Sequence, residues 1–135
     1  MYESLILVDN DSNITTNITT NGLLAELQSF YADNKYAPLE IMAASQTITL
    51  RWDHCMLQVA REELPHVAEE SAEIAEQFAG SHPAKDRIAQ CKCRFTTSSD
   101  DDLEMTHFND YLFIGEVLKR LGTVYRFDQS TCEFL

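Results

Sequence analysis

Short apolar runs and the alternation of apolar with polar residues predict six β-strands and a possible seventh. The six strands are residues 5–8, 39–44, 46–52, 55–61, 87–96 and 123–127, and the possible seventh is 131–135. Two predicted strands flank Asp53-His54, which indicates a hairpin with a two-residue connection. At the end of the chain, a turn over residues 128–130 would let Tyr125 and Phe127 pair with Cys132 and Phe134.

Apolar residues that recur every three or four positions predict three helices. Asn21 and Thr106 have side chains suited to cap the first and third helices, and Pro65 lies where the second helix can begin. Gly122 follows the third helix and is a typical stop signal. The predicted helices are residues 21–34, 63–79 and 106–121.

The order of these elements predicts an α+β fold. Strands follow one another early in the chain and alternate with helices later, which favours an antiparallel or mixed sheet with about three helices packed mainly on one face. We expect residues 1–135 to form a single domain. The Asn-Ile-Thr-Thr sequence at 13–16 recurs at 17–20 and predicts an exposed loop or an edge hairpin.

Residues 87–121 are expected to form the centre of this fold. In the strand at 87–96 the two faces differ in polarity, which predicts a sheet with water on one side. The less polar face carries Ala89, Cys91, Cys93 and Phe95, and the other carries Gln90, Lys92, Arg94 and Thr96. An acidic, solvated loop at 97–105 follows. The helix at 106–121 is so apolar that we expect it to contact the sheet and also another helix or a second subunit, and a homodimer is predicted on this ground.

The composition is that of a globular protein with a strongly negative charge. Hydrophobic residues make up 44% of the 135 residues, and the formal net charge is −12 with a pI near 4.5. That charge disfavours nucleic acid and anionic membrane surfaces and suits a basic protein partner. With no apolar run long enough for a membrane span and no signal peptide at the start, the sequence predicts a cytoplasmic protein with reduced cysteines.

Cysteine and histidine side chains can bind metal, and cysteine can also act as a nucleophile. Cys91 and Cys93 lie two residues apart within a predicted strand, whereas structural zinc sites use pairs such as C-x₂-C on a turn. Cys55 follows His54, but neighbours on a strand point to opposite faces. Core packing is therefore the expected role of these thiols, and no cofactor, metal or catalytic residue is predicted. The cysteines and histidines of the sequence are Cys55, Cys91, Cys93, Cys132, His54, His66, His82 and His107. Glycine-rich phosphate-binding motifs are absent from the sequence.

A polar site is expected at the start of the third helix. His107 follows the acidic loop, and if that loop folds over a pocket formed with Trp52, the histidine is the first choice for a binding residue. The candidate binding residues are Trp52, Asp100, Asp101, Asp102, His107 and Tyr111.

The sequence leaves three hypotheses about the function. The preferred hypothesis is an acidic protein–protein interaction module, such as an adaptor, a chaperone-like protein or an inhibitor. The alternative is a small-molecule-binding or enzymatic domain with a pocket between sheet and helices. The third is a metal-dependent protein that uses Cys91 and Cys93.

Overall fold

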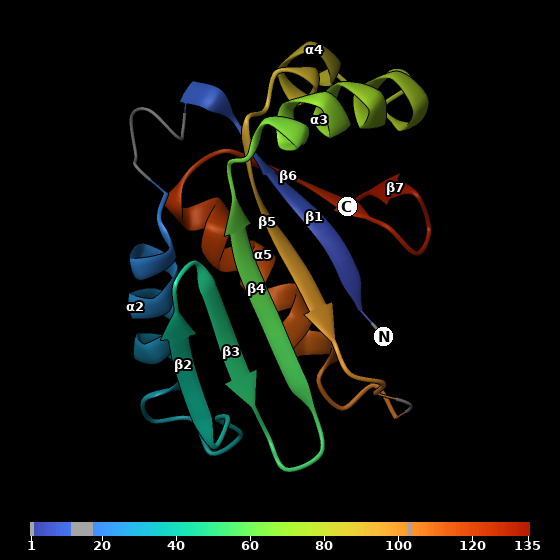
Figure 1. Cartoon of the computed structure of the whole chain (residues 1–135). Helices are drawn as coiled ribbons and strands as arrows, with labels where there is room; N and C mark the ends of the chain where they lie inside the picture. Colours follow the sequence, from blue (N-terminus) through green and yellow to red (C-terminus); the bar gives the residue numbers. More distant parts are fainter. Residues whose placement is uncertain (1, 12–17, 103) are drawn as a thin grey trace.

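The computed structural model describes residues 2–11, 18–102 and 104–135 and contains one seven-stranded antiparallel sheet (Figure 1). Within the described residues there are also four helices. The α+β class with an antiparallel sheet is therefore confirmed, with four helices in place of about three. In sheet order the strands are β2 (Glu40–Ala44), β3 (Thr47–Arg51), β4 (Met56–Glu62), β5 (Cys93–Ser99), β1 (Glu3–Val8), β6 (Val124–Asp128) and β7 (Glu133–Phe134). The helices are α2 (Thr20–Tyr31), α3 (Pro65–Phe78), α4 (Lys85–Ala89) and α5 (Phe108–Leu121).

The first strand joins two halves of the sheet. β1 lies between β5 and β6, with Ile6 opposite Phe95 on one side and opposite Arg126 on the other. β5 is the middle strand of the seven, as expected for the stretch at 87–121. The C-terminal hairpin forms as predicted, but its turn extends to Cys132 and its last strand is only Glu133–Phe134, so Phe127 pairs with Phe134 and Tyr125 has no partner in β7.

Helices α2 and α5 cover one face of the sheet. Ile6 and Val8 of β1 pack there with Phe95 of β5 in a core that includes Leu27 of α2 and Ile114 of α5. In Figure 1 α5 runs behind the sheet and α2 lies beside it. The apolar residues of α5 are thus buried by the sheet and by α2 together.

Helices α3 and α4 cover one end of the opposite face. Leu5 and Leu7 alternate with Ile6 and Val8, so they point away from the first core, and they pack with Ile74 of α3 and Ile88 of α4. Both faces of β1 are therefore apolar and buried, which explains its uninterrupted run of apolar residues. Figure 1 places these two helices in front of the upper end of the sheet, while the lower part of β2, β3 and β4 carries no helix on that face.

The predicted strand at 87–96 is wrong in its first half. Residues Lys85–Ala89 form α4, and β5 begins only at Cys93. Ile88 and Cys91 are three positions apart, so a helical turn directs both of them into the second core, whereas a strand would direct them to opposite faces. As a consequence, Cys91 and Cys93 lie in different cores on opposite sides of the sheet.

The solvated face predicted for this strand is also wrong. Arg94 is only 5% exposed, because α3 covers it. Its guanidinium forms ion pairs with Glu70 of α3 and with Glu62 of β4. The charge of Arg94 therefore reflects ion pairs with α3 and β4, and not contact with water.

The helix caps differ from those predicted. Thr19 caps α2, and its Oγ1 accepts a hydrogen bond of 3.0 Å from the amide of Gly22. Asn21 lies inside that helix, which ends at Tyr31 in place of residue 34. Thr106 does not cap α5, because the helix begins at Phe108 with His107 as its N-cap residue. The predicted loop at 13–20 lies largely outside the described residues, and its last residue, Thr20, begins α2. None of the helices in the described residues has the length and apolar character needed to cross a membrane.

A buried arginine fixes the distance between α5 and the sheet. Arg126 of β6 is 5% exposed and donates hydrogen bonds to Ser4 Oγ (3.2 Å) and to the carbonyl oxygens of Leu112 (3.2 Å) and Tyr111 (2.9 Å). Its guanidinium also lies over the ring of Tyr111, 4.2 Å from the centroid. Gly115 leaves the space for this side chain, because a Cβ at that position would come within 2.3 Å of Nη1.

We expect Gly115→Ala to destabilise the protein by about 1–3 kcal/mol, although alanine in an open helix position would gain up to about 1 kcal/mol. The three hydrogen bonds hold the guanidinium in place, so the added methyl group must push α5 away from β6. Chemical denaturation monitored by circular dichroism measures the change. The loss should shrink in an Arg126→Met background, and an unchanged or raised stability of Gly115→Ala alone would contradict this packing argument.

Candidate functional site

A cleft of about 790 Å³ lies at the start of α5. Three segments form its walls: the loop between α2 and β2, the β3–β4 connection, and the acidic loop between β5 and α5. Its volume lies within the range of ligand-binding sites in proteins. The lining residues are Lys35, Tyr36, Ala37, Leu39, Trp52, Asp53, His54, Cys55, Asp101, Asp102, Glu104, Thr106, His107 and Asp110.

The cleft brings together Trp52 and His107, as the sequence suggested. Their rings lie 4.3 Å apart, centroid to centroid, and the indole nitrogen of Trp52 donates to the carbonyl oxygen of Tyr36 (3.0 Å). Asp110 orients the imidazole, with Nδ1 of His107 3.1 Å from Oδ2. The other oxygen of Asp110 accepts a short hydrogen bond from the hydroxyl of Tyr31 in α2. Burial and this carboxylate raise the pKa of Tyr31, so its hydroxyl stays a donor.

Asp102 holds the acidic loop against the start of α5. Its carboxylate accepts hydrogen bonds from the amides of Thr106 (3.0 Å) and His107 (2.7 Å) and from the hydroxyl of Tyr2 (2.6 Å). Burial alone would raise the pKa of Asp102, but these hydrogen bonds lower it. The loop is therefore not wholly solvated, because one of its four carboxylates binds the backbone of the two residues that precede α5.

Negative charge dominates the walls of the cleft. Five carboxylates line it and only one lysine, so its formal charge is −4 with both histidines neutral. Apolar surface lies among these charges, since Tyr36 is 70% exposed and Leu39 is 62% exposed. A ligand that complements both features carries positive charge together with apolar groups.

Two of the predicted binding residues do not line the cleft. Asp100 is exposed at the end of β5, where its amide donates to the carbonyl oxygen of Met56 (3.1 Å). Tyr111 is buried below, stacked on Tyr2 at 4.8 Å and under the guanidinium of Arg126. The structure therefore brings together Trp52, Asp101, Asp102 and His107 from the predicted set. It adds Tyr36 and Asp110, which the sequence analysis had not singled out.

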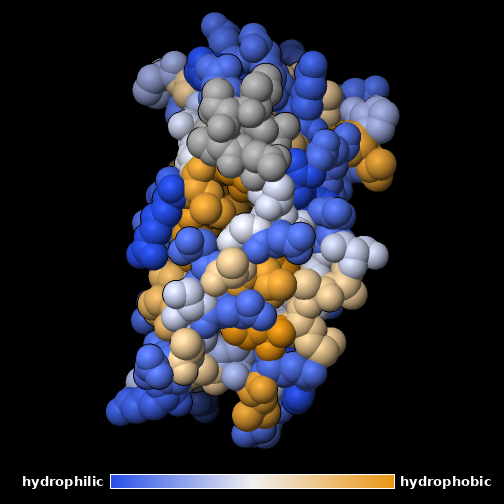
Figure 2. Space-filling view, turned by 90° about the vertical axis from the view of Figure 1, so that its left-hand side faces the viewer, coloured by the Kyte–Doolittle hydropathy of each residue, from blue (hydrophilic) through white to orange (hydrophobic). Residues whose placement is uncertain are grey.

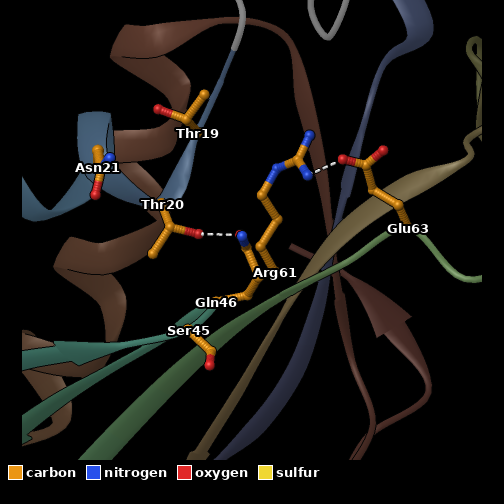
Figure 3. A pocket seen from close by; sticks show the side chains of 7 residues that line it. All are labelled: Thr19, Thr20, Asn21, Ser45, Gln46, Arg61 and Glu63. Carbon is orange, nitrogen blue, oxygen red and sulfur yellow. Dashed lines mark hydrogen bonds and ion pairs between the residues drawn. The ribbon is translucent and has the colours of Figure 1, made fainter.

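A smaller hollow of about 340 Å³ lies at the start of α2 and is lined by polar residues (Figure 3). The hydroxyl of Thr20 donates to the side chain of Gln46 (2.7 Å), and Arg61 pairs with Glu63 and donates to the carbonyl oxygen of Ile18 (3.1 Å). These contacts join α2 to the β2–β3 turn and to β4. We therefore assign this hollow a structural role.

A second polar cluster that the sequence did not reveal holds α4 to the sheet. Asp9 is 1% exposed and accepts two hydrogen bonds of 2.6 Å from Arg87 and one of 2.7 Å from the hydroxyl of Tyr125. The Arg87 hydrogen bonds lower the pKa of Asp9 to about 2 in spite of burial, and Tyr125 and the amide of Asp11 contribute. Arg87 had been placed on a strand, and this misassignment hid the cluster.

The thiols at the core positions are poor nucleophiles. Burial raises the pKa of Cys91 to about 12 and that of Cys93 to about 11. Burial and the nearby carboxylates Asp102 and Asp100 also raise the pKa of Cys55 in the cleft. A thiol that stays protonated at neutral pH neither attacks a substrate nor binds metal readily. Among the described residues, no three histidine, cysteine, aspartate or glutamate side chains converge as metal ligands would.

No protein-family model matches this chain, and neither curated proteins nor solved structures gave a significant match.

We expect one of the four cysteines to react quickly with a thiol reagent in the native protein. Cys132 is exposed, whereas Cys55, Cys91 and Cys93 are buried. Colour development with an aromatic disulfide reagent should show about one fast equivalent in buffer and four in denaturant. Native Cys132→Ser protein should show no fast equivalent, and one fast equivalent there would mean that a buried thiol such as Cys55 in the cleft is activated.

We expect Asp9→Asn to lower the free energy of unfolding at neutral pH by about 2 kcal/mol, because the native pKa of Asp9 is near 2 and its ordinary value is 3.8. A carboxylate with a lowered native pKa stabilises the fold above its unfolded-state pKa. This contribution disappears as the pH falls from about 4 toward 2. Denaturation curves between pH 2 and 7 should show that part of the acid dependence in the wild type and not in Asp9→Asn.

Asp11→Asn is the matched control for this prediction. Asp11 also pairs with Arg87, but its side chain is 75% exposed, and exposed pairs contribute roughly 0–1 kcal/mol. Equal losses for the two variants would show that burial of Asp9 does not matter.

Proposed function

We propose that this protein is an interaction module that binds a basic segment of a partner protein in the cleft at the start of α5. The observation that carries the proposal is the lining of that cleft, with five carboxylates and one lysine around exposed aromatic and aliphatic side chains. A peptide with alternating basic and apolar residues matches both features. Lysine and arginine side chains are suited to such walls, because their methylene stems pack on apolar surface while the charged ends reach carboxylates.

The arrangement of the cleft supports peptide binding in three ways. The ring of Trp52 offers an aromatic surface to a cation. Asp110 is fixed by a hydrogen bond from Tyr31, and Asp102 is fixed by hydrogen bonds from Tyr2 and from the amide of His107, so two of the five charges are preorganised. The exposed lining residues Tyr36 and Leu39 would lose water contact when a segment lies across the opening.

The proposal also includes the cellular location of the protein and the number of its subunits. We place the protein in the cytoplasm, where its cysteines stay reduced. The homodimer stays a prediction, and the reason first given for it has changed. Contact of α5 with α2 and with the sheet accounts for the apolar residues of that helix.

The alternative, a small-molecule site, would use the same walls. A small cationic molecule would meet the same carboxylates but would leave the exposed lining residues uncovered. A protein segment is preferred because the lining residues Tyr36 and Leu39 are both more than half exposed.

Trp52 is the only tryptophan in the sequence, so its fluorescence reports on the cleft directly. We expect a peptide of alternating arginine and leucine to change this fluorescence in a saturable way, and the same peptide with citrulline for arginine to bind at least about tenfold more weakly. Added salt should weaken the arginine peptide. Absence of any saturable change with peptides or with free arginine amide would contradict the proposal, and binding of arginine amide alone would favour the small-molecule alternative.

A pair of charge-matched double variants locates the site. Asp53→Asn with Glu104→Gln removes two charges from the cleft and should weaken the peptide about tenfold. Glu69→Gln with Glu73→Gln removes two exposed charges from α3 and should leave binding within about twofold. Equal weakening by both pairs would show that only the net charge of the protein matters.

A further inference from the structure

The β2 strand forms an open edge of the sheet. It pairs with β3 on one side, and no strand in the described residues pairs with its other side. Met42 is 50% exposed, and Ala43 and Ala44 are also exposed. Figure 2 looks onto this side of the molecule, and hydrophobic atoms in orange and tan run down its middle between hydrophilic ones.

This edge lacks the devices that keep sheet edges apart. Soluble proteins protect such edges with lysine, with proline, with bulges inside the strand or with very short strands. From Ile41 to Ala44 the strand carries neither a charge nor a proline. The opposite edge of the sheet is β7, which is only two residues long.

The register of the β2–β3 hairpin determines which backbone groups face the open side. Ala44 lies opposite Thr47 across the turn at Ser45 and Gln46, and Ser45 has the positive φ of 56° that such turns require. The pair that closes a two-residue turn is hydrogen-bonded, and bonded residues alternate along an antiparallel strand. Glu40, Met42 and Ala44 therefore direct their amides and carbonyls toward β3, and Ile41 and Ala43 direct theirs outward.

The outward amides and carbonyls of one β2 strand can form hydrogen bonds with the same groups of a second β2 strand. When two β2 strands run antiparallel around a two-fold axis at Met42, Ile41 of each copy lies opposite Ala43 of the other, and each such pair exchanges two backbone hydrogen bonds. Other registers also pair the outward backbone groups, but this one aligns all of Glu40–Ala44 with the same residues of the second copy. It also places Met42 against Met42 of the second copy, so both exposed side chains become buried.

Charge permits this pairing although each copy carries −12. Residues 33–51 contain two acids and two bases, so the hairpin and the loop before it are formally neutral. Glu40 and Arg51 form an ion pair with each other (3.0 Å) on the strands themselves. The excess of acids lies elsewhere, largely on α3 and around the cleft.

From the open edge, its self-complementary register and its neutral charge, we propose that β2 pairs with β2 of a second copy to form a homodimer with one continuous sheet. This interface goes beyond the proposed peptide site, because the pairing itself uses the outer edge of β2 and not the cleft walls. An edge contact of five residues buries little area, so the dimer is expected to form in the micromolar range. Because the rest of the two copies repel, added salt should strengthen the dimer, whereas it weakens peptide binding.

The first test is the mass of the full chain in sedimentation equilibrium from about 1 µM to about 500 µM. Wild-type protein should approach twice its 15.4 kDa, and Met42→Lys should remain at the monomer mass with an unchanged circular dichroism spectrum. Gln58→Lys is the matched control, since Gln58 is exposed on the same face of the sheet but on the inner strand β4, and this variant should still dimerise. A wild-type monomer throughout this range, or a dimer that Met42→Lys leaves intact, would overturn the proposal.

The second test fixes the register through a disulfide in a Cys132→Ser background. Residues opposite each other at a non-bonded position have Cα atoms about 4.5 Å apart, which a disulfide can bridge. Met42→Cys should therefore form a covalent dimer under mild oxidation, and Ala43→Cys, which lies opposite Ile41 of the second copy, should not. Cross-linking of Ala43→Cys alone would overturn the two-fold axis at Met42.

Discussion

Insertion of β1 between β5 and β6 is the contact on which the rest of the structure depends. Six residues near the N-terminus pair with strands about 90 and 120 residues further along the chain. Without β1, the sheet would separate into β2–β5 and the C-terminal hairpin, and each of the two cores would lose one wall. Leu5 and Leu7 serve one core while Ile6 and Val8 serve the other, so β1 also couples the two helical layers. Such long-range pairing carries a high entropic cost of loop closure, and burial of both faces of β1 offsets that cost.

Buried polar side chains then fix how the helices sit on the sheet. Arg126 connects β6 to the first turns of α5, Arg94 connects β5 to α3, and Asp9 connects β1 to Arg87 of α4. Each of these groups is hydrogen-bonded in its place, and each would be costly to bury without its partner. Apolar contacts tolerate small shifts of a helix, but a guanidinium bound to two carbonyl oxygens does not. We infer that these three side chains give the helices their orientation more than they add to stability.

The two proposed interaction surfaces differ in their physical character. The cleft at the start of α5 combines fixed carboxylates with exposed aromatic surface, and it suits a ligand of opposite charge. The edge of β2 is neutral and offers backbone hydrogen bonds, and it suits a strand like itself. Because ionic strength acts in opposite directions on them, the two surfaces can be studied separately. Leu39 precedes β2 and also lines the cleft, so the two surfaces meet at one end of the strand.

The sequence by itself determined the class of the fold and most of its elements. Periods of two and of three to four are properties of neighbouring residues, so the β3–β4 hairpin, α3, α5 and the presence of a C-terminal hairpin could be predicted, although the register of that last hairpin could not. It also led to the hypothesis that Trp52 and His107 lie at the same pocket. Tertiary structure decided what the local pattern leaves open. Cys91 fits a strand through its alternation with Cys93 and fits a helical turn through its spacing from Ile88, and packing against Leu7 and Ile74 selects the turn and separates Cys91 from Cys93. The burial of Arg94 and Asp9, the hydrogen bond between Tyr2 and Asp102 and the open edge of β2 all depend on how distant parts of the chain come together. A residue's own neighbours carry no record of those partners, and this is the physical reason that they could not be predicted.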